Sequence, residues 1–301
     1  MPLTGRTESV VAVDLGGTNM RCAIVDADGD LHARIQRPTP HDEPCTVALV
    51  DLVGRVRDSV DDPPGIIVMG VPGRVDYETR SLVSGPNLPA GWVDELAAAP
   101  LADQLGAEVH LANDADLAAV GEVAFGAAQG HRNVAYVTIS TGVGGGVVLD
   151  GKLARSRWSL AEVGHTVVSL ERWRAGLDPT VEGIGAGPAI ALAAAEAGLP
   201  GDAKRISEMV RAGDPAATAV WDDALRASGA GIVNVVHLFG PDVVVVGGGV
   251  GLNDDIVLDR LGRILDEIGP AEIIGRVALV RAALGDDAAL SGGAAWRAAF
   301  G

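Results

Sequence analysis

Apolar and polar positions follow one another along this chain in blocks that predict strands and helices in turn. Short apolar runs at residues 10–16, 20–26 and 31–38 are typical of strands, and residues 46–60 have the spacing of an amphipathic helix. Residues 65–76 read as a buried strand entering a glycine turn, and a helix at 95–106 and a strand at 108–114 follow. This alternation predicts an α/β fold.

One structural device occurs twice. The strand, glycine turn and strand at residues 10–26 are matched in order and character by residues 133–153, where the turn is a glycine cluster at 142–146. Two hairpins of one design predict an internally duplicated, mixed-sheet core. From residue 186 the chain is mainly helical, apart from a buried strand at 242–250 and a closing helix at 289–300. We expect a smaller lobe of residues 1–112 plus 289–301 and a larger lobe of residues 113–288.

Composition and charge exclude several classes of protein. A length of 301 residues, 48% of them hydrophobic, suits two lobes with large cores. No long uncharged apolar segment and no apolar signal core are present, so we expect a cytoplasmic protein without a membrane span. A formal net charge of −17 argues against nucleic acid as a partner. Lysine occurs only at Lys152 and Lys204, so backbone amides, arginine or a metal ion must hold any bound anion.

Three glycine clusters follow three apolar strands, at residues 16–17, 142–146 and 247–249. One such cluster is most often a plain tight turn. Three clusters, with Thr18, Asn19 and Thr141 beside the first two, favour backbone cradles for phosphate. Asp14 would repel a phosphate unless a divalent cation lay between them, so we expect Mg²⁺ to bind there through water. A nucleoside triphosphate held by two hairpins fits this pattern.

Several acidic and polar residues are candidates for chemistry on a second ligand. Asn113 and Asp114 end a predicted strand just before a helix, where they could be helix caps or could include a general base that is already ionised at neutral pH. Glu162 and His165 are three residues apart, a spacing that is more often structural than catalytic, and Glu182 follows farther on. Together these residue types suit a ligand with many hydroxyl groups, such as a sugar.

These motifs, taken together, resemble the ROK family of bacterial sugar kinases and sugar-responsive repressors. DLGGTN, GVPGRVD, SGPNLPAGW, NDAD, STGVGGGVV, EVGH, VEGIGAG and VVVGGGV occur in family order over nearly the whole chain. The resemblance implies a two-lobed actin-like ATPase fold of the ribonuclease H-like type. It also implies ATP-dependent phosphorylation of a hexose or hexosamine at its 6-hydroxyl, with ATP and Mg²⁺ as cofactors.

The resemblance also assigns roles to individual residues. Asp114 is similar to the catalytic base of the family. The implied sugar-binding residues are Gly73, Asn87, Asn113, Asp114, Glu162, His165 and Glu182. The implied nucleotide-binding residues are Asp14, Gly16, Gly17, Thr18, Asn19, Thr141, Gly142, Gly248 and Gly249.

Two departures from the family pattern stand out. Kinases of the family usually carry a cysteine-rich zinc module after EVGH, but residues 166–182 here contain no cysteine, so we expect no structural zinc. Leu170, Trp173 and Leu177 are candidates to pack in place of the metal, and Trp173 could instead influence the choice of sugar. Asp116 stands where the family usually has asparagine, and a second carboxylate near Asp114 would raise the pKa of one of the two.

Several alternatives stay open at this point. The sugar could be glucose, another hexose, an N-acetylhexosamine or an amino sugar such as kanosamine, because one or two hydroxyl contacts decide the choice. Polyphosphate could replace ATP as the donor. A protein of another class, a non-catalytic sugar-responsive regulator of the ROK family, is the alternative function, although only about ten residues precede the first glycine hairpin. Family members are commonly dimers, so we expect a homodimer.

Overall fold

A computed structural model describes residues 6–251 and 255–300 of the chain. The chain divides by internal contacts into two units. Unit 1 comprises Met1–Arg132, Gly146–Leu160 and Asp286–Gly301, and unit 2 comprises Asn133–Gly145 and Ala161–Gly285. The lobe limits given above follow from motif positions and stay a prediction.

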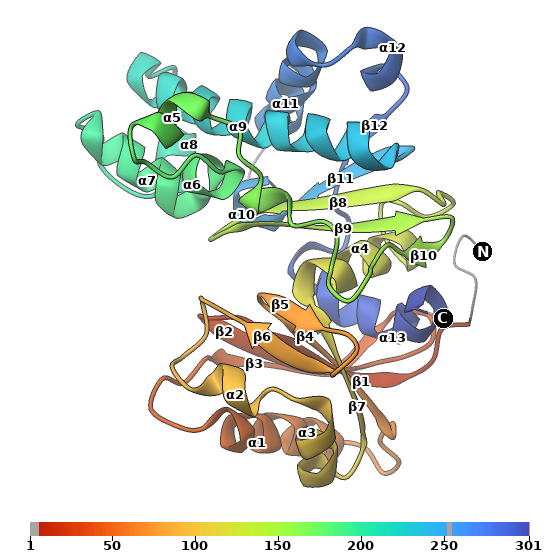
Figure 1. Cartoon of the computed structure of the whole chain (residues 1–301). Coiled ribbons are helices and arrows are strands. Elements are labelled where there is room, and N and C mark those ends of the chain that lie inside the picture. The colour runs from red at the N-terminus through yellow and green to blue at the C-terminus, as the bar shows by residue number, and fades with distance from the viewer. Residues whose placement is uncertain (1–5, 252–254, 301) are drawn as a thin grey trace. The chain divides into compact units, whose positions relative to one another are not determined.

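Unit 1 is built on a mixed five-stranded sheet of order β3-β2-β1-β4-β7 (Figure 1). Strands β1, β2 and β3 pair antiparallel, and β1, β4 and β7 pair parallel. The strands are β1 (Val10–Leu15), β2 (Asn19–Val25), β3 (Leu31–Pro38), β4 (Ile66–Val71) and β7 (Glu108–Asn113). Because the parallel strands β1, β4 and β7 end at the same edge, the residues that follow them gather there.

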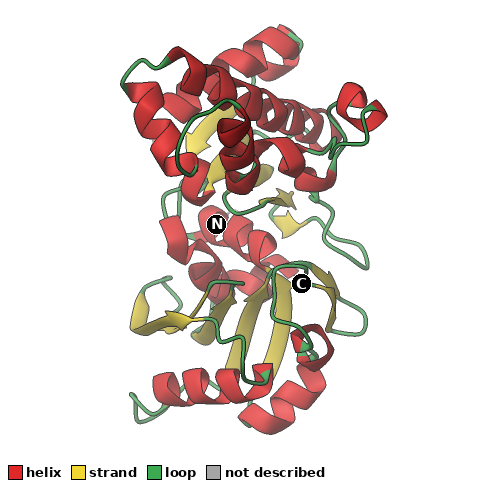
Figure 2. Cartoon of the chain, turned by 90° about the vertical axis from the view of Figure 1, so that its left-hand side faces the viewer, coloured by secondary structure: helices red, strands yellow, loops and turns green. Residues whose placement is uncertain are grey.

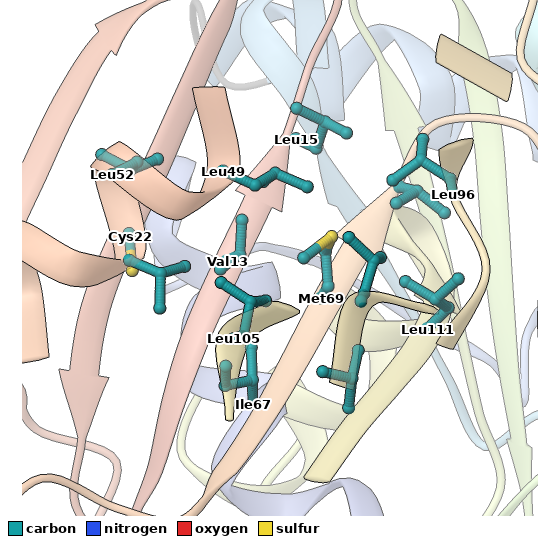
Figure 3. Packing of buried hydrophobic residues seen from close by; sticks show 14 of the residues in the cluster. Val13, Leu15, Cys22, Leu49, Leu52, Ile67, Met69, Leu96, Leu105 and Leu111 are labelled. Atoms are coloured by element: carbon teal, nitrogen blue, oxygen red, sulfur yellow. The ribbon is translucent and has the colours of Figure 1, made fainter. Parts of the chain in front are cut away.

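Helices cover both faces of this sheet (Figures 1 and 2). On one face, Leu49 and Leu52 of α1 and Leu105 of α3 pack with Val13 and Met69 of the sheet (Figure 3). On the other face α4 and α13 cross closely at glycines 121 and 292. A side chain at either position would overlap the facing backbone, so glycine permits this close approach. Besides the sheet, unit 1 contains these helices, a further short helix and a small hairpin of strands β5 and β6. These elements are α1 (Cys45–Arg57), β5 (Arg74–Asp76), β6 (Ser81–Ser84), α2 (Trp92–Glu95), α3 (Ala98–Leu105), α4 (Asp114–Ala124) and α13 (Ala288–Phe300).

The second five-stranded sheet, of order β10-β9-β8-β11-β12, repeats the order of the first. Strand β11 pairs parallel with β8 and β12, just as β4 pairs with β1 and β7. The predicted α/β fold with a duplicated mixed-sheet core is therefore confirmed. The strands are β8 (Val134–Ile139), β9 (Val143–Leu149), β10 (Lys152–Leu153), β11 (Val243–Gly247) and β12 (Ala278–Arg281), and the division between the units falls within β9.

One expectation about this second hairpin is wrong. Residues 142–146 do not form a turn of five residues, because β9 begins at Val143 and Gly144 to Gly146 lie inside it. Their small size serves packing instead: a Cβ at Gly145 would lie 2.9 Å from the carbonyl oxygen of Ala161. Only the residues between β8 and β9 remain to form the turn.

Unit 2 is otherwise helical. Its longest helix, α9, buries Trp221, Leu225 and Ile232 among other apolar side chains. Among the described residues, none of the helices combines the length and the apolar character needed to cross a membrane. The helices are α5 (Leu170–Arg174), α6 (Val181–Gly185), α7 (Gly187–Glu196), α8 (Ala203–Arg211), α9 (Pro215–Phe239), α10 (Gly248–Gly251), α11 (Asp255–Ile268) and α12 (Ala271–Ile274), with 3-10 turns at Val163–His165 and, toward α13, at Gly285–Asp287.

Candidate active site

The first glycine hairpin of unit 1 is fixed from two sides. Within the turn, the Gly16 N–H donates to the carbonyl oxygen of Asn19, and the Thr39 hydroxyl donates to the carbonyl oxygen of Gly16 at 2.6 Å. A side chain at Gly17 would overlap the carbonyl oxygen of Asn87. Glycine at this position therefore lets the loop that carries Asn87 lie directly against the turn. Two predicted site segments are thus brought together.

Asp14 forms an ion pair with Arg21, a residue that the sequence reasoning did not single out. Arg21 lies opposite Asp14 in the antiparallel register of β1 and β2, and its Nη1 donates to Asp14 Oδ2 at 2.7 Å. Burial raises the pKa of Asp14 above its ordinary value, and the guanidinium opposes that rise. The tight glycine turn is the signal that could have revealed this pair, because it sets the register of the hairpin.

Asn113 and Asp114 lie where expected, at the junction between β7 and α4, but they do different things. Asn113 is the cap of α4: its Oδ1 accepts hydrogen bonds from the N–H groups of Ala115 and Asp116. Its Nδ2 donates to the carbonyl oxygen of Gly73 at 3.0 Å, so the two residues are joined. Gly73 has a φ of 114°, a conformation that favours glycine.

The electrostatic state of Asp114 differs from the expectation. Burial raises the pKa of this carboxyl to about 7, and the carboxylates of Asp14 and Asp116 push it in the same direction. The expectation that Asp114 is fully ionised at neutral pH is therefore wrong. A group with a pKa near the working pH is well matched to taking up and releasing a proton. The side chain is half-buried at the first position of α4.

The second hairpin and the third glycine cluster meet in unit 2. The turn between β8 and β9 closes when the Ser140 N–H donates to the carbonyl oxygen of Gly142 at 2.8 Å. Gly248, with a φ of 82°, lies against the carbonyl oxygen of Ile139 at the end of β8. A cavity of about 490 Å³ opens beside both segments, and its lining includes Thr141, Pro188, Lys204, Gly249 and Val250. The hydroxyls of Ser140 and Thr141 and the ammonium group of Lys204 suit an anionic ligand with an apolar portion, and Asp202 is an acidic group in the same lining.

Three further predicted residues lie around the start of β9. The Val143 N–H donates to Glu182 Oε2 at 2.9 Å. On the carbonyl side of Val143, Gly164 of the EVGH turn packs so closely that a side chain there would overlap the backbone. His165 Nε2 and Glu162 Oε2 are 3.8 Å apart in that same turn. Glu162, His165 and Glu182 are thus gathered beside Thr141 and Gly142, within one unit.

The segment between His165 and Glu182 holds itself together by hydrogen bonds. The Val168 N–H donates to the carbonyl oxygen of Pro179, and the Val181 N–H donates to that of Thr166. The Asp178 carboxylate accepts hydrogen bonds from the N–H and the hydroxyl of Thr180. The Thr180 hydroxyl in turn accepts a hydrogen bond from Gly183 and so caps α6, the helix that carries Glu182.

This segment does not fit a structural zinc. Tetrahedral zinc needs four nitrogen or sulfur ligands, and the segment offers no cysteine. Within residues 6–251 and 255–300, no group of three or more His, Cys, Asp or Glu side chains is placed to hold a metal ion. The expectation that Leu170, Trp173 and Leu177 pack in place of zinc is wrong, because these side chains are 61%, 64% and 53% exposed.

Comparisons with known proteins find similarity over nearly the whole chain. A sequence model of the ROK family matches residues 10–299. The glucokinase of Thermotoga maritima is 30% identical to this chain and covers 95% of it, with 96% of that protein covered. A ROK hexokinase from Thermus thermophilus is 33% identical, with a TM-score of 0.79 and coverage of 95% and 96%. A ROK family glucokinase from Streptomyces griseus, solved in complex with glucose and AMPPNP, is 29% identical, with a TM-score of 0.80 and coverage of 96% and 98%.

Proposed function

The chain belongs to the ROK family, and we propose that it is an ATP-dependent sugar kinase that phosphorylates the 6-hydroxyl of a hexose or hexosamine. Relatives named glucokinase or hexokinase that match almost end to end support this assignment. The structure of one such relative contains glucose and an ATP analogue, which supports ATP as the donor. Mg²⁺–ATP, when bound, supplies the phosphoryl group and neutralises the charge that develops on it.

The observation that carries the proposal is the state of Asp114. Asn113 is the cap of α4, so the Asp114 carboxylate, whose Oδ1 accepts a hydrogen bond from the Ala115 N–H at 2.9 Å, is not required as the cap and can serve a ligand. With a pKa of about 7, this carboxyl in its ionised form can accept the proton of a sugar hydroxyl as the hydroxyl oxygen attacks the γ-phosphorus of ATP and ADP leaves. We assign Asp114 as the general base.

The other predicted residues bind and orient the two substrates. The predicted sugar-binding residues Asn87, Gly73, Asn113, Glu162, His165 and Glu182 offer the carboxylate, imidazole, amide and backbone groups that bind hydroxyls. The nucleotide phosphates are assigned to the two glycine hairpins, and the adenosine portion to the cavity beside Gly248 and Gly249.

Asp14 is assigned to Mg²⁺ through water. Its carboxylate already has the Arg21 guanidinium on one oxygen, so a hydrated ion is more suitable here than direct coordination. Mg²⁺ usually retains several waters and needs only one or two protein carboxylates, and Asp14 can supply one of them.

The test is a panel of hexoses and hexosamines, including glucose, mannose, N-acetylmannosamine and kanosamine, assayed with Mg²⁺–ATP by coupling to ADP release. Parallel reactions contain inorganic polyphosphate instead of ATP. We expect turnover with at least one sugar, and a loss of about 10²–10⁴-fold in kcat for Asp114→Ala. Sugar binding by calorimetry should persist in that variant. Sugar binding by the wild-type protein without any turnover would favour the regulator instead.

We also propose that the protein is a homodimer. Light scattering after gel filtration measures its mass, and a particle of one chain would refute this.

A further inference from the structure

A buried carboxylate lies close to the proposed base but does not belong to the proposed reaction. Asp116, in the first turn of α4, has no exposed surface. Its Oδ2 accepts a hydrogen bond from the Tyr77 hydroxyl at 2.7 Å, and its Oδ1 accepts one from the Ser159 hydroxyl at 3.1 Å. A carboxylate in the protein interior is unfavourable unless such donors are present, so these two hydrogen bonds stabilise Asp116 in its buried position.

Tyr77 joins Asp116 to the backbone just before the base. Its hydroxyl oxygen accepts a hydrogen bond from the Asn113 N–H at 3.3 Å while it donates to Asp116. Asn113 directly precedes Asp114, and its side chain caps the same helix turn. One hydroxyl group therefore connects the end of β7 with the first turn of α4, on either side of Asp114.

The ring of Tyr77 is itself held firmly. It lies 5.2 Å from the ring of Phe300 and 6.1 Å from that of Trp296, both on α13. The guanidinium of Arg155 lies 5.6 Å from its centre. Burial, together with the nearby Asp116 carboxylate, raises the pKa of Tyr77 well above its ordinary value, so the hydroxyl keeps its proton and acts as a donor.

The segment around Tyr77 is fixed as well. The neighbouring Asp76, also buried, accepts two hydrogen bonds from the Arg157 guanidinium, at 2.9 and 2.6 Å. The Tyr77 N–H donates to the carbonyl oxygen of Arg157 at 3.0 Å. The segment that carries Arg157 and Ser159 therefore contacts both Tyr77 and Asp116. All the residues of this hydrogen-bond network belong to unit 1.

We propose that Tyr77 is a positioning residue for catalysis: by bonding the Asp116 carboxylate and the Asn113 N–H at once, it fixes the turn that aims the Asp114 carboxylate. Residues two apart on a helix do not share a face, so Asp116 can be held in the interior while Asp114 is presented to a substrate. Tyr77 acts through the backbone and does not touch the sugar. The inference rests on the proposed kinase function.

The principal test replaces Tyr77 by Phe, which keeps the ring and removes only the hydroxyl. In the wild-type enzyme and in Tyr77→Phe, kcat and KM are measured for the sugar that supports turnover and for ATP. We expect kcat to fall by about 10- to 100-fold, because small misplacements of a reacting group are costly, while both KM values change by less than about threefold. The matched control is Ser228→Ala, which removes a buried hydroxyl from α9 in unit 2 and should leave kcat unchanged.

A second pair of variants guards against a simple folding defect. Asp116→Asn keeps an oxygen that can accept the Tyr77 hydroxyl, whereas Asp116→Ala removes it. We expect the asparagine variant to retain most of the kcat that the alanine variant loses. If Tyr77→Phe has the same kcat as the wild-type enzyme, or if both Asp116 variants lose equal amounts of kcat, the positioning role is refuted. In either case, turnover by the wild-type enzyme still supports the kinase assignment. Absence of turnover in the wild-type protein with every sugar would overturn both.

Discussion

Replacement of Asp114 by asparagine should make the protein more stable, by an amount that depends on pH. Burial and two neighbouring carboxylates raise the pKa of Asp114 from 3.8 to about 7. A rise of roughly three units means that the charged form is disfavoured in the folded state by about 4 kcal/mol relative to the unfolded state. Asparagine has nearly the same shape and carries no charge, so it avoids this cost.

The sign and the pH range follow from proton binding. Between about pH 4 and pH 7 the folded wild-type protein binds more protons at Asp114 than the unfolded chain does, so this residue lowers stability progressively as the pH rises. Below this range Asp114 is protonated in both states, and above it the full cost is present. The stability gained by Asp114→Asn should therefore be small at pH 4.5 and reach its largest value, up to about 4 kcal/mol, at pH 8.

Urea denaturation of the wild-type protein and Asp114→Asn, at half-unit steps from pH 4.5 to pH 8.5, measures this difference. Circular dichroism and tryptophan fluorescence should be recorded together, because coincident transitions are needed before a single free energy of unfolding is assigned. The control is Asp103→Asn on an exposed face of α3, which should show no such trend. A gain for Asp114→Asn that is independent of pH, or a loss at pH 8, would refute the argument from burial.

Two more predictions concern the rest of the site. Gly17→Ala should lower kcat/KM by about 10²-fold, because the added Cβ would overlap the Asn87 carbonyl oxygen and displace that loop. Gly54→Ala, at an open position on α1, should instead stabilise the protein by about 0.5–1 kcal/mol. The same effect on activity and stability in both variants would contradict the packing argument. Elemental analysis of the purified protein should find no stoichiometric zinc, and a zinc chelator should leave the melting temperature unchanged; one tightly held zinc per chain would show that ligands were overlooked.

Much of the fold could be predicted from local pattern. The strands around Gly16 and Gly17 and the repeat of that hairpin near Thr141 are short apolar runs with glycine turns, and both sheets form as the pattern indicates. The junction of β7 with α4 at Asn113 was also readable, because a capping residue between an apolar strand and a helix is a local signal. Local signals of this kind need no knowledge of tertiary contacts.

Properties that depend on tertiary contacts could not be predicted in the same way. The pKa of Asp114 depends on burial and on Asp14, which is a hundred residues away in the sequence. Trp173 is exposed although its apolar side chain predicts burial. Backbone hydrogen bonds and the Asp178–Thr180 contacts hold that segment without it. Glycines inside β9 resembled turn residues, since composition alone does not separate a flexible turn from a tightly packed strand.

The two carboxylates in the first turn of α4 are treated in opposite ways, and the difference explains how an unfavourable charge can be kept at this position. Asp116 receives side-chain donors from Tyr77 and Ser159, which stabilise a buried charge and order the turn. Asp114 accepts hydrogen bonds from backbone N–H groups of the same turn, and these lower its pKa too little to offset burial. A poorly compensated carboxylate tends to rearrange unless its surroundings fix it. The Asn113 cap and the Tyr77 hydrogen bonds supply that constraint. The favourable contacts of these neighbours therefore hold Asp114 in place, although its own charge is unfavourable there.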